Sequence, residues 1–203
     1  MPTQLISVNL IQLHWLAQTA NKHTEQAIPM NGSFRLFVFA GEPKAPATRA
    51  ALASFSQHSL APSSYFSSFL RPDASSVSYH ELHNPHSRFL SFCTIFAAPH
   101  SSLYNVGGKG GVGDILPEFL ARYRDNIFAD DIADWRVPEV QGPGAAHKKM
   151  GFERGVVVVR PDGYVGCVVK LVEGEGTVTA LNEYFSAFVG KSLGGAGGVK
   201  AQL

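Results

Sequence analysis

A nearly continuous apolar run begins at residue 34 of the 203-residue chain and reads Phe34-Arg35-Leu36-Phe37-Val38-Phe39-Ala40-Gly41. Its length and aromatic content are typical of a β-strand that is buried on both faces of a sheet. Gly41 and Pro43 end the run, and Pro46 and Thr48 follow at positions where a helix can begin. We therefore expect a buried strand followed by a helix, with Thr48 as the helix N-cap.

The rest of the chain alternates between strand-like and helix-like patterns. The spacing of apolar residues predicts a helix that opens at Pro46 and Thr48 and runs to 59, a second piece over 63–70, and a strand over 89–98. A helix over 115–123 capped by Asp114, a short strand over 127–129 and a helical turn over 147–150 ending at Gly151 follow. The last expected elements are a hairpin of 156–159 and 164–171 and a helix over 178–189. An early strand–helix–strand unit implies parallel neighbours, and the late hairpin adds antiparallel strands. The order predicts an α/β protein with a thioredoxin-like fold, which has a mixed central sheet with helices on both faces.

Composition and charge limit the domain organisation and the partners. The sequence is 45% hydrophobic and 16% charged, so we expect one domain over residues 28–190, with an N-terminal extension of uncertain structure over 1–27 and a flexible Gly-rich tail over 191–203. The net charge of +1 gives no reason to expect nucleic acid or a membrane surface as a partner. No stretch reaches the length of a membrane span, and two cysteines cannot form a disulfide framework, so we expect a cytoplasmic protein.

The position at which thioredoxin-like enzymes carry their nucleophile has no cysteine in this chain. In those enzymes the thiol follows the first core strand, where the start of the next helix lowers its pKa. Here that segment, residues 41–48, contains no cysteine. In the expected sheet, Cys93 and Cys167 lie three strand spacings apart, about 14 Å, whereas a disulfide needs Cα atoms within about 7 Å. The sequence therefore argues against dithiol chemistry and gives no CxxC motif.

A glycine-rich loop over Gly107–Gly113 matches the G-x-G-x-x-G pattern of dinucleotide-binding loops. Asp130 and Asp131 lie near the distance at which such a site has its acidic ribose ligand. The loop does not fit a P-loop, because Asp114 and Ile115 stand where Lys and Ser or Thr are required. A lone match is weak, and a surface loop is the favoured interpretation.

Three histidines, His80, His83 and His86, recur at intervals of three, a spacing that places zinc ligands on one face of a helix. Asn84 and Pro85 interrupt any helix through them, so a polar loop is the favoured interpretation. The hairpin turn reads Arg160-Pro161-Asp162-Gly163-Tyr164, and these residues suit a tight turn in which Arg160 pairs locally. We therefore expect no metal site and a structural role for the turn.

Four segments resemble the C-terminal domain of FAD-dependent phenol hydroxylases (phenol 2-monooxygenases). The hairpin from Val156 to Gly166 resembles a signature near the end of that family. The runs over 31–41 and 93–99 are similar to its first two strands, and Phe128-Ala129-Asp130-Asp131 followed by 146–151 resembles its later segment with two aspartates and a lysine-bearing turn. The resemblance covers about residues 28–190.

The resemblance implies a thioredoxin-like dimerisation domain without redox cysteines. In that family FAD and the catalytic residues lie in other domains, so the resemblance assigns no catalytic, cofactor-binding or metal-binding residue to this chain. It implies a homodimer or a flavoprotein hydroxylase as the partner, and a connection to aromatic-compound metabolism.

Two further functions stay open beside an interaction module. Tyr65, Phe66, Phe69 and Trp135 are the candidate interface residues, because they are numerous for one small core. The alternative is a small enzyme or ligand-binding protein, with a pocket between the Gly-rich loop, His100 and the loop around Trp135. A redox protein is the third hypothesis, and the missing cysteine in the 41–48 segment argues against it.

Overall fold

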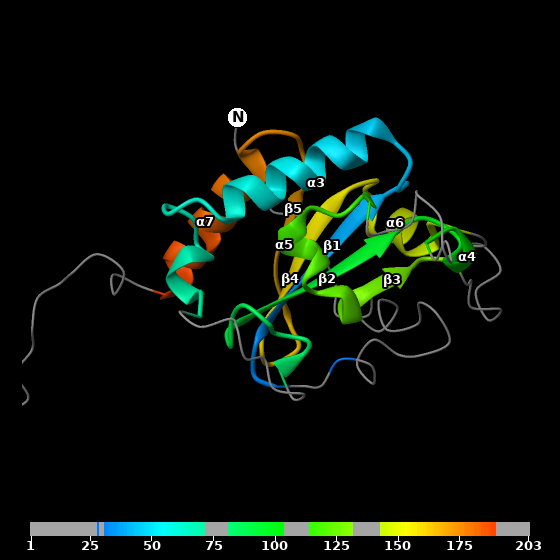
Figure 1. The fold of residues 1–203 in the computed structure, drawn as a ribbon. Helices are drawn as coiled ribbons and strands as arrows, with labels where there is room; N and C mark the ends of the chain where they lie inside the picture. Colours follow the sequence, from blue (N-terminus) through cyan, green and yellow to red (C-terminus); the bar gives the residue numbers. More distant parts are fainter. Residues whose placement is uncertain (1–27, 29–30, 72–80, 104–113, 132–142, 190–203) are drawn as a thin grey trace, which may run out of the picture.

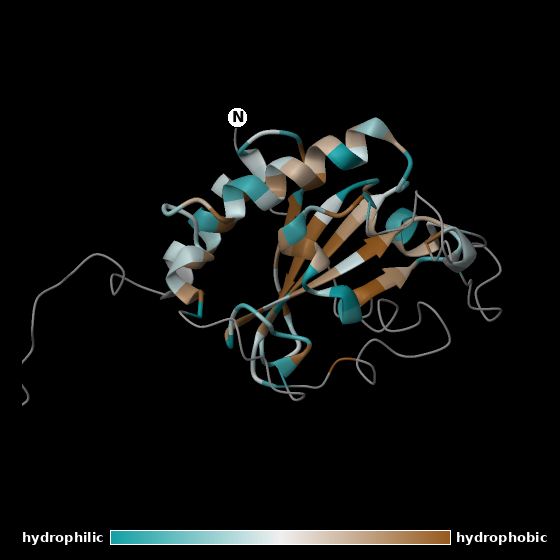
Figure 2. Cartoon of the chain, viewed as in Figure 1, coloured by the Kyte–Doolittle hydropathy of each residue, from teal (hydrophilic) through white to brown (hydrophobic). Residues whose placement is uncertain are grey.

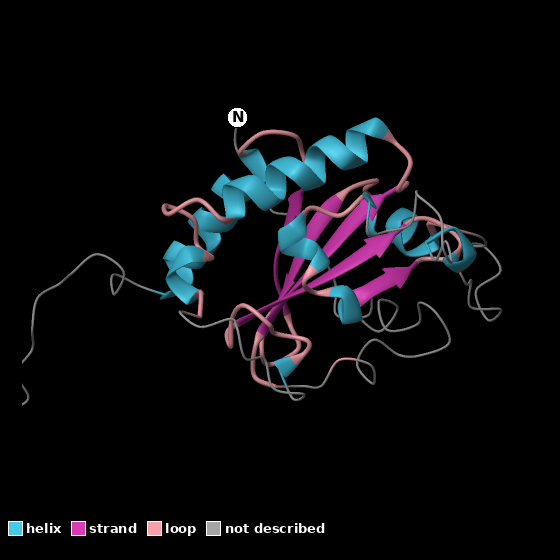
Figure 3. Ribbon diagram, in the orientation of Figure 1, coloured by secondary structure: helices cyan, strands magenta, loops and turns pink. Residues whose placement is uncertain are grey.

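A computed structural model describes residues 28, 31–71, 81–103, 114–131 and 143–189. Within them a five-stranded sheet has the order β3-β2-β1-β4-β5 (Figure 1). The strands are β1 Phe34–Gly41, β2 Leu90–Phe96, β3 Ile127–Ala129, β4 Gly155–Val159 and β5 Val165–Lys170. The longer helices are α3 Pro46–Ser59 and α7 Gly176–Val189, and the shorter ones are η3 Ser67–Phe69, α4 His100–Leu103, α5 Glu118–Ala121, η6 Arg124–Asn126 and α6 Ala145–Met150 (Figure 3).

The directions of the strands confirm the expected mixed sheet. β1 pairs with β2 in parallel, and β2 pairs with β3 in parallel. β4 runs antiparallel to β1, with Leu36 opposite Val158, and β5 runs antiparallel to β4. This α/β arrangement is consistent with a thioredoxin-like fold, in which the central strand has a parallel neighbour on one side and a hairpin on the other.

The two faces of β1 contribute to two separate apolar layers. Leu36, Val38 and Ala40 pack into the larger core, which α3, α5 and α7 cover. Phe37 and Phe39 point the other way, because successive side chains of a strand alternate between its faces, and they pack with Met150 of α6. Helices therefore lie on both faces, and the sheet between them is predominantly hydrophobic (Figure 2).

Arg35 is the charged residue within β1, and the fold buries it. Its exposed fraction is 6%, and its Nη2 atom donates to the carbonyl of Ile28 at 3.0 Å. Buried guanidinium groups need hydrogen-bond acceptors, so this contact fixes the segment before β1 against the face that carries Phe37 and Phe39.

Two expected helix caps are wrong. α3 begins at Pro46, as expected, but its N-cap is Ala45 rather than Thr48, whose side chain is buried. Proline is preorganised for the first helical turn, which places the cap at the residue before Pro46. The helix expected over 115–123 is reduced to α5, whose N-cap is Pro117 rather than Asp114, because a residue before proline is disfavoured in the helical region.

The other expected elements form within a few residues of their expected bounds, except that one helix is shorter than expected. The hairpin, the 127–129 strand, α6 with Gly151 at its C-cap and α7 all form. The helix piece expected over 63–70 is a single 3₁₀ turn, η3. Among the described residues, no helix is long and apolar enough to cross a membrane. The extension over 1–27, the Gly107–Gly113 loop, Trp135, His80 and the tail over 191–203 lie outside the described residues.

Candidate functional site

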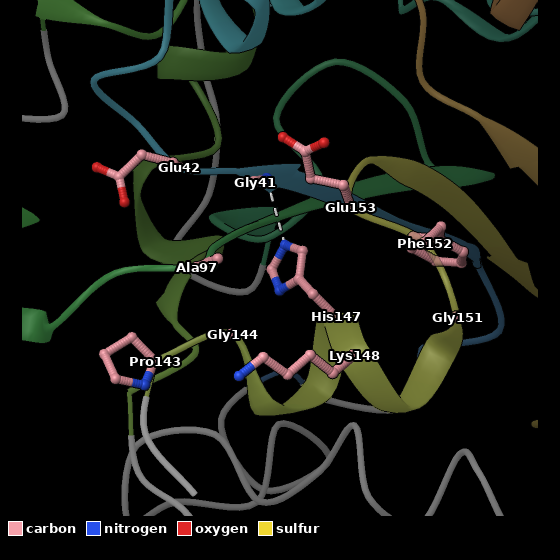
Figure 4. A pocket seen from close by; sticks show the side chains of 10 residues that line it. All are labelled: Gly41, Glu42, Ala97, Pro143, Gly144, His147, Lys148, Gly151, Phe152 and Glu153. Carbon is pink, nitrogen blue, oxygen red and sulfur yellow. Dashed lines mark hydrogen bonds between the residues drawn. The ribbon is translucent and has the colours of Figure 1, made fainter. Parts of the chain in front are cut away.

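A cavity lies at the carboxyl ends of the parallel strands β1 and β2, the end of an open α/β sheet where ligands commonly bind. Its volume is about 510 Å³, which is within the range of small-molecule sites. Figure 4 shows the lining residues, which come from the ends of β1 and β2 and from the α6 region: Gly41, Glu42, Ala97, Pro143, Gly144, His147, Lys148, Gly151, Phe152 and Glu153.

His147 of α6 lies at the centre of this cavity wall, and both of its ring nitrogens are engaged. The Gly41 N–H donates to Nε2 at 3.2 Å, so Nε2 carries no proton (Figure 4). The Nδ1 atom lies 2.8 Å from Oδ2 of Asp130, to which it therefore donates its proton. The imidazole is buried, and the hydrogen bonds to Gly41 and Asp130 fix the orientation of its ring.

Asp130 follows β3 and connects that strand to α6. Its two carboxylate oxygens accept the N–H groups of Ala146 at 3.0 Å and His147 at 3.1 Å, in addition to the imidazole Nδ1–H. Its own N–H donates to the carbonyl of Phe96 in β2 at 2.8 Å. Asp130 and His147 therefore join β1, β2, β3 and α6 through hydrogen bonds.

The charged side chains of the cavity lie at its rim. Lys148 and Glu42 are exposed, and Lys148 extends toward Pro143 (Figure 4). Glu153 pairs with Arg154 at 2.7 Å. The deeper wall is formed by Ala97, by Gly144 and by the ring of Phe152, which can hold an apolar group and offers little electrostatic specificity.

Gly41 is required at its position for two reasons. Its φ is +81°, in the left-handed region that favours glycine. A Cβ atom there would lie 3.1 Å from Cγ of Arg154 and 3.3 Å from the carbonyl oxygen of Glu153. The close approach lets the Gly41 N–H reach His147, so this glycine belongs to the structure of the site.

Both cysteines are free and buried, one in β2 and the other in β5. Three strand spacings separate β2, with Cys93, from β5, with Cys167, as expected. The two thiols also belong to the separate apolar layers on opposite faces of the sheet. Burial raises the pKa of each thiol to about 12, which keeps both protonated at neutral pH.

The histidines expected to lie in a polar loop take part in packing. His83 Nδ1 contacts Oδ1 of Asn126, whose Nδ2 donates to the carbonyl of Phe92 at 3.0 Å. His86 is buried beside the rings of Phe119 and Tyr123. In the described part of the chain, no group of three potential metal-ligating side chains comes together.

The candidate interface residues separate into two environments. Tyr65 and Phe66 are buried in the larger core, where Tyr65 stacks on Phe185 with ring centroids 4.9 Å apart. Their side chains are enclosed by the chain's own core and do not form a surface. Phe69 is half-buried at the edge of this core and reaches Phe89.

The hairpin turn has the local structure that its sequence predicts. Arg160 pairs with Asp162 at 2.5 Å, and Gly163 has a φ of +84°. Pro161 lies in the turn, and Tyr164 closes it through its carbonyl, which accepts the N–H of Arg160 at 2.8 Å. These contacts form the turn and present Tyr164 half exposed to solvent.

Sequence reasoning missed the Asp130–His147 pair as a structural unit. The two residues are 17 positions apart, and no local motif joins them. A possible signal was present, because both residues fall within the two segments whose order resembles the phenol hydroxylase family. The exposure of Phe89 was also missed, because this residue continues the apolar run of β2.

Comparison with known families gives one match that spans most of the chain. The family model described as "Phenol hydroxylase, C-terminal dimerisation domain" matches residues 8–193. The match begins inside the 1–27 segment and includes every described strand and helix. The chain therefore belongs to the phenol hydroxylase C-terminal dimerisation domain family.

Proposed function

We propose that this chain is a non-catalytic module that forms a homodimer. Its family is defined by dimerisation, which supports self-association. One observation in the structure supports the proposal that the chain is non-catalytic. The polar groups at the carboxyl end of the sheet bind one another: Asp130 accepts three hydrogen bonds and His147 uses both ring nitrogens. The Gly41 N–H occupies the lone pair of His147 Nε2, so this nitrogen could take a substrate proton only if that hydrogen bond broke.

The position of the cysteines supports the same proposal. A thioredoxin-like enzyme needs an exposed thiolate at the start of the first helix. Here Ala45 and Pro46 occupy the start of α3, and both thiols are buried in the core. The cellular setting that we propose is cytoplasmic. A flavoprotein hydroxylase of aromatic-compound metabolism would carry FAD, and this chain would carry none.

The cavity favours a second candidate function, which is binding of a small ligand. Its volume of about 510 Å³ and its apolar wall with Phe152 would suit a flat, largely apolar molecule. Titration of the chain with 2-naphthol, followed by NMR, tests this candidate. Saturable shifts confined to the amides of Gly41, Gly144 and Phe152 would support it, and shifts spread over the chain or no shifts would reject it.

The solution mass of the purified chain tests self-association directly. We expect light scattering to give twice the chain mass of 21.9 kDa, and we expect an absorbance scan of the same sample to show no flavin band. A mass of one chain at all concentrations would reject the homodimer. A stoichiometric flavin band would reject the proposal that the chain holds no cofactor.

A further inference from the structure

The end of the sheet at which β1 and β2 begin lies opposite α6 (Figure 1), and large apolar side chains are exposed near it. Phe89, directly before β2, is 58% exposed, and Leu70, directly after η3, is 39% exposed. The rings of Phe69 and Phe89 lie 5.5 Å apart between centroids, and the Arg71 N–H donates to the carbonyl of His86 at 2.9 Å. Phe69, Leu70 and Phe89 therefore form one surface, named here the Phe89 patch.

The Phe89 patch is fixed to the core of the domain. The carbonyl of Phe89 accepts the N–H of Phe34 at 2.7 Å, which ties the patch to the start of β1. The ring of Phe69 lies 6.5 Å from that of Phe185 in α7. A patch whose backbone is already ordered loses little conformational entropy on binding, and aromatic residues, Phe included, are enriched in the cores of protein interfaces.

Charges of both signs surround the Phe89 patch. Glu81 pairs with Arg71 at 2.9 Å and with Arg88 at 3.5 Å, and the Arg88 side chain is 75% exposed. An apolar centre with a charged rim is the usual composition of a protein interface. A twofold contact needs a surface that complements itself, and a rim with both signs allows an arginine of one copy to face a glutamate of the other. The net charge of +1 adds little repulsion between two copies.

We propose that the Phe89 patch is the surface on which a second copy of this chain docks. Two observations favour a second copy as the binding partner: the family is one of dimerisation domains, and the charges around the patch can complement themselves. The inference rests on the proposed self-association and adds where on the fold it occurs. It moves the interface from the buried Tyr65 and Phe66 to the exposed residues that follow η3 and precede β2.

A charge substitution in the patch tests the proposal. In Phe89→Glu a twofold contact would bring two carboxylates into an apolar centre, and we expect the dimer dissociation constant to rise at least about 30-fold, as for loss of an interface hot spot. The matched control is Val172→Glu. Val172 is also 39% exposed, like Leu70, but it follows β5 at the opposite end of the sheet. Circular dichroism of both variants confirms that they fold.

Cross-linking locates the contact without weakening it. Both native cysteines are buried, so Phe89→Cys adds the exposed thiol. We expect a short bismaleimide to join two Phe89→Cys chains and to leave Val172→Cys chains unjoined. If the unaltered chain is a monomer, the proposed self-association fails and this inference fails with it. If the chain is a dimer that Phe89→Glu does not weaken and Phe89→Cys does not cross-link, only the location fails.

Discussion

The Nδ1 atom of His147 lies 2.8 Å from Oδ2 of Asp130, and this contact joins α6 to the residue that follows β3. The carboxylate also accepts the N–H groups of Ala146 and His147. In Asp130→Asn one acceptor oxygen becomes an N–H₂ group that faces other donors. We expect a loss of about 2–3 kcal/mol in the free energy of unfolding, measured by urea denaturation.

The control for this prediction is Asp162→Asn in the hairpin turn. Asp162 also accepts a side-chain hydrogen bond, from the Arg160 guanidinium, but both side chains are partly exposed. Water screens such pairs, so we expect a loss below about 1 kcal/mol. Equal losses in Asp130→Asn and Asp162→Asn would show that the buried pair does not hold the β3–α6 junction.

The two cysteines should resist modification in the folded chain. Burial raises the pKa of Cys93 and Cys167 from 9.0 to about 12, which lowers the thiolate fraction at pH 8 by about a thousandfold. We expect an aromatic disulfide reagent to react slowly with the native chain and to titrate two thiols in urea. Rapid reaction of one thiol under native conditions, or reduction of a disulfide substrate by the chain, would contradict its placement in the core.

Gly166 in β5 lies under the ring of Tyr184. A Cβ atom at Gly166 would lie 2.0 Å from the Tyr184 hydroxyl and 2.7 Å from its Cζ. Gly166→Ala should therefore reduce the free energy of unfolding by about 1–3 kcal/mol, as expected for overpacking.

A double-mutant cycle shows whether this ring is the cause. In the Tyr184→Ala background the added methyl group meets no ring, so Gly166→Ala should cost much less. An equal cost in both backgrounds would assign the effect to the strand backbone instead.

His86 should make the domain less stable in mild acid. Burial, with the Arg122 guanidinium as a second cause, lowers the pKa of His86 below its usual 6.5. The unfolded chain then binds more protons than the folded chain below pH 6.5, so stability falls as the pH falls through this range. We expect urea midpoints to decrease from pH 7.5 to 5.5, and less so in His86→Phe, which keeps an aromatic ring beside Phe119. If the urea midpoint of His86→Phe changed with pH as steeply as that of the unaltered chain, His86 would not be the cause of the acid sensitivity.

The elements that sequence patterns predict well are those whose pattern is local. The run over 34–41 is apolar on both faces and forms the central strand, and Pro161 and Gly163 define a turn that forms as expected. α7 follows from its apolar stripe, which includes Leu181 and Phe185. Each of these signals lies within about a dozen residues, a range over which periodicity is informative.

The features that sequence did not predict depend on distant contacts. Thr48 has the residue type of an N-cap, but its side chain is buried in the folded chain and Pro46 begins the helix. Asp130 and His147 meet because the residue that follows β3 lies beside the first turn of α6, where Gly144 also donates its N–H to the Asp130 carbonyl. Tyr65 and Phe89 are both aromatic, and only the packing of α7 and η3 makes one buried and the other exposed.

Sedimentation equilibrium of the purified chain over a wide concentration range tests the central claim most directly. A homodimerisation module should give masses that rise from one chain to two and fit a single monomer–dimer equilibrium. Phe89→Glu should move that equilibrium toward the monomer, and Val172→Glu should leave it in place. A constant mass of 21.9 kDa at every concentration would contradict the account.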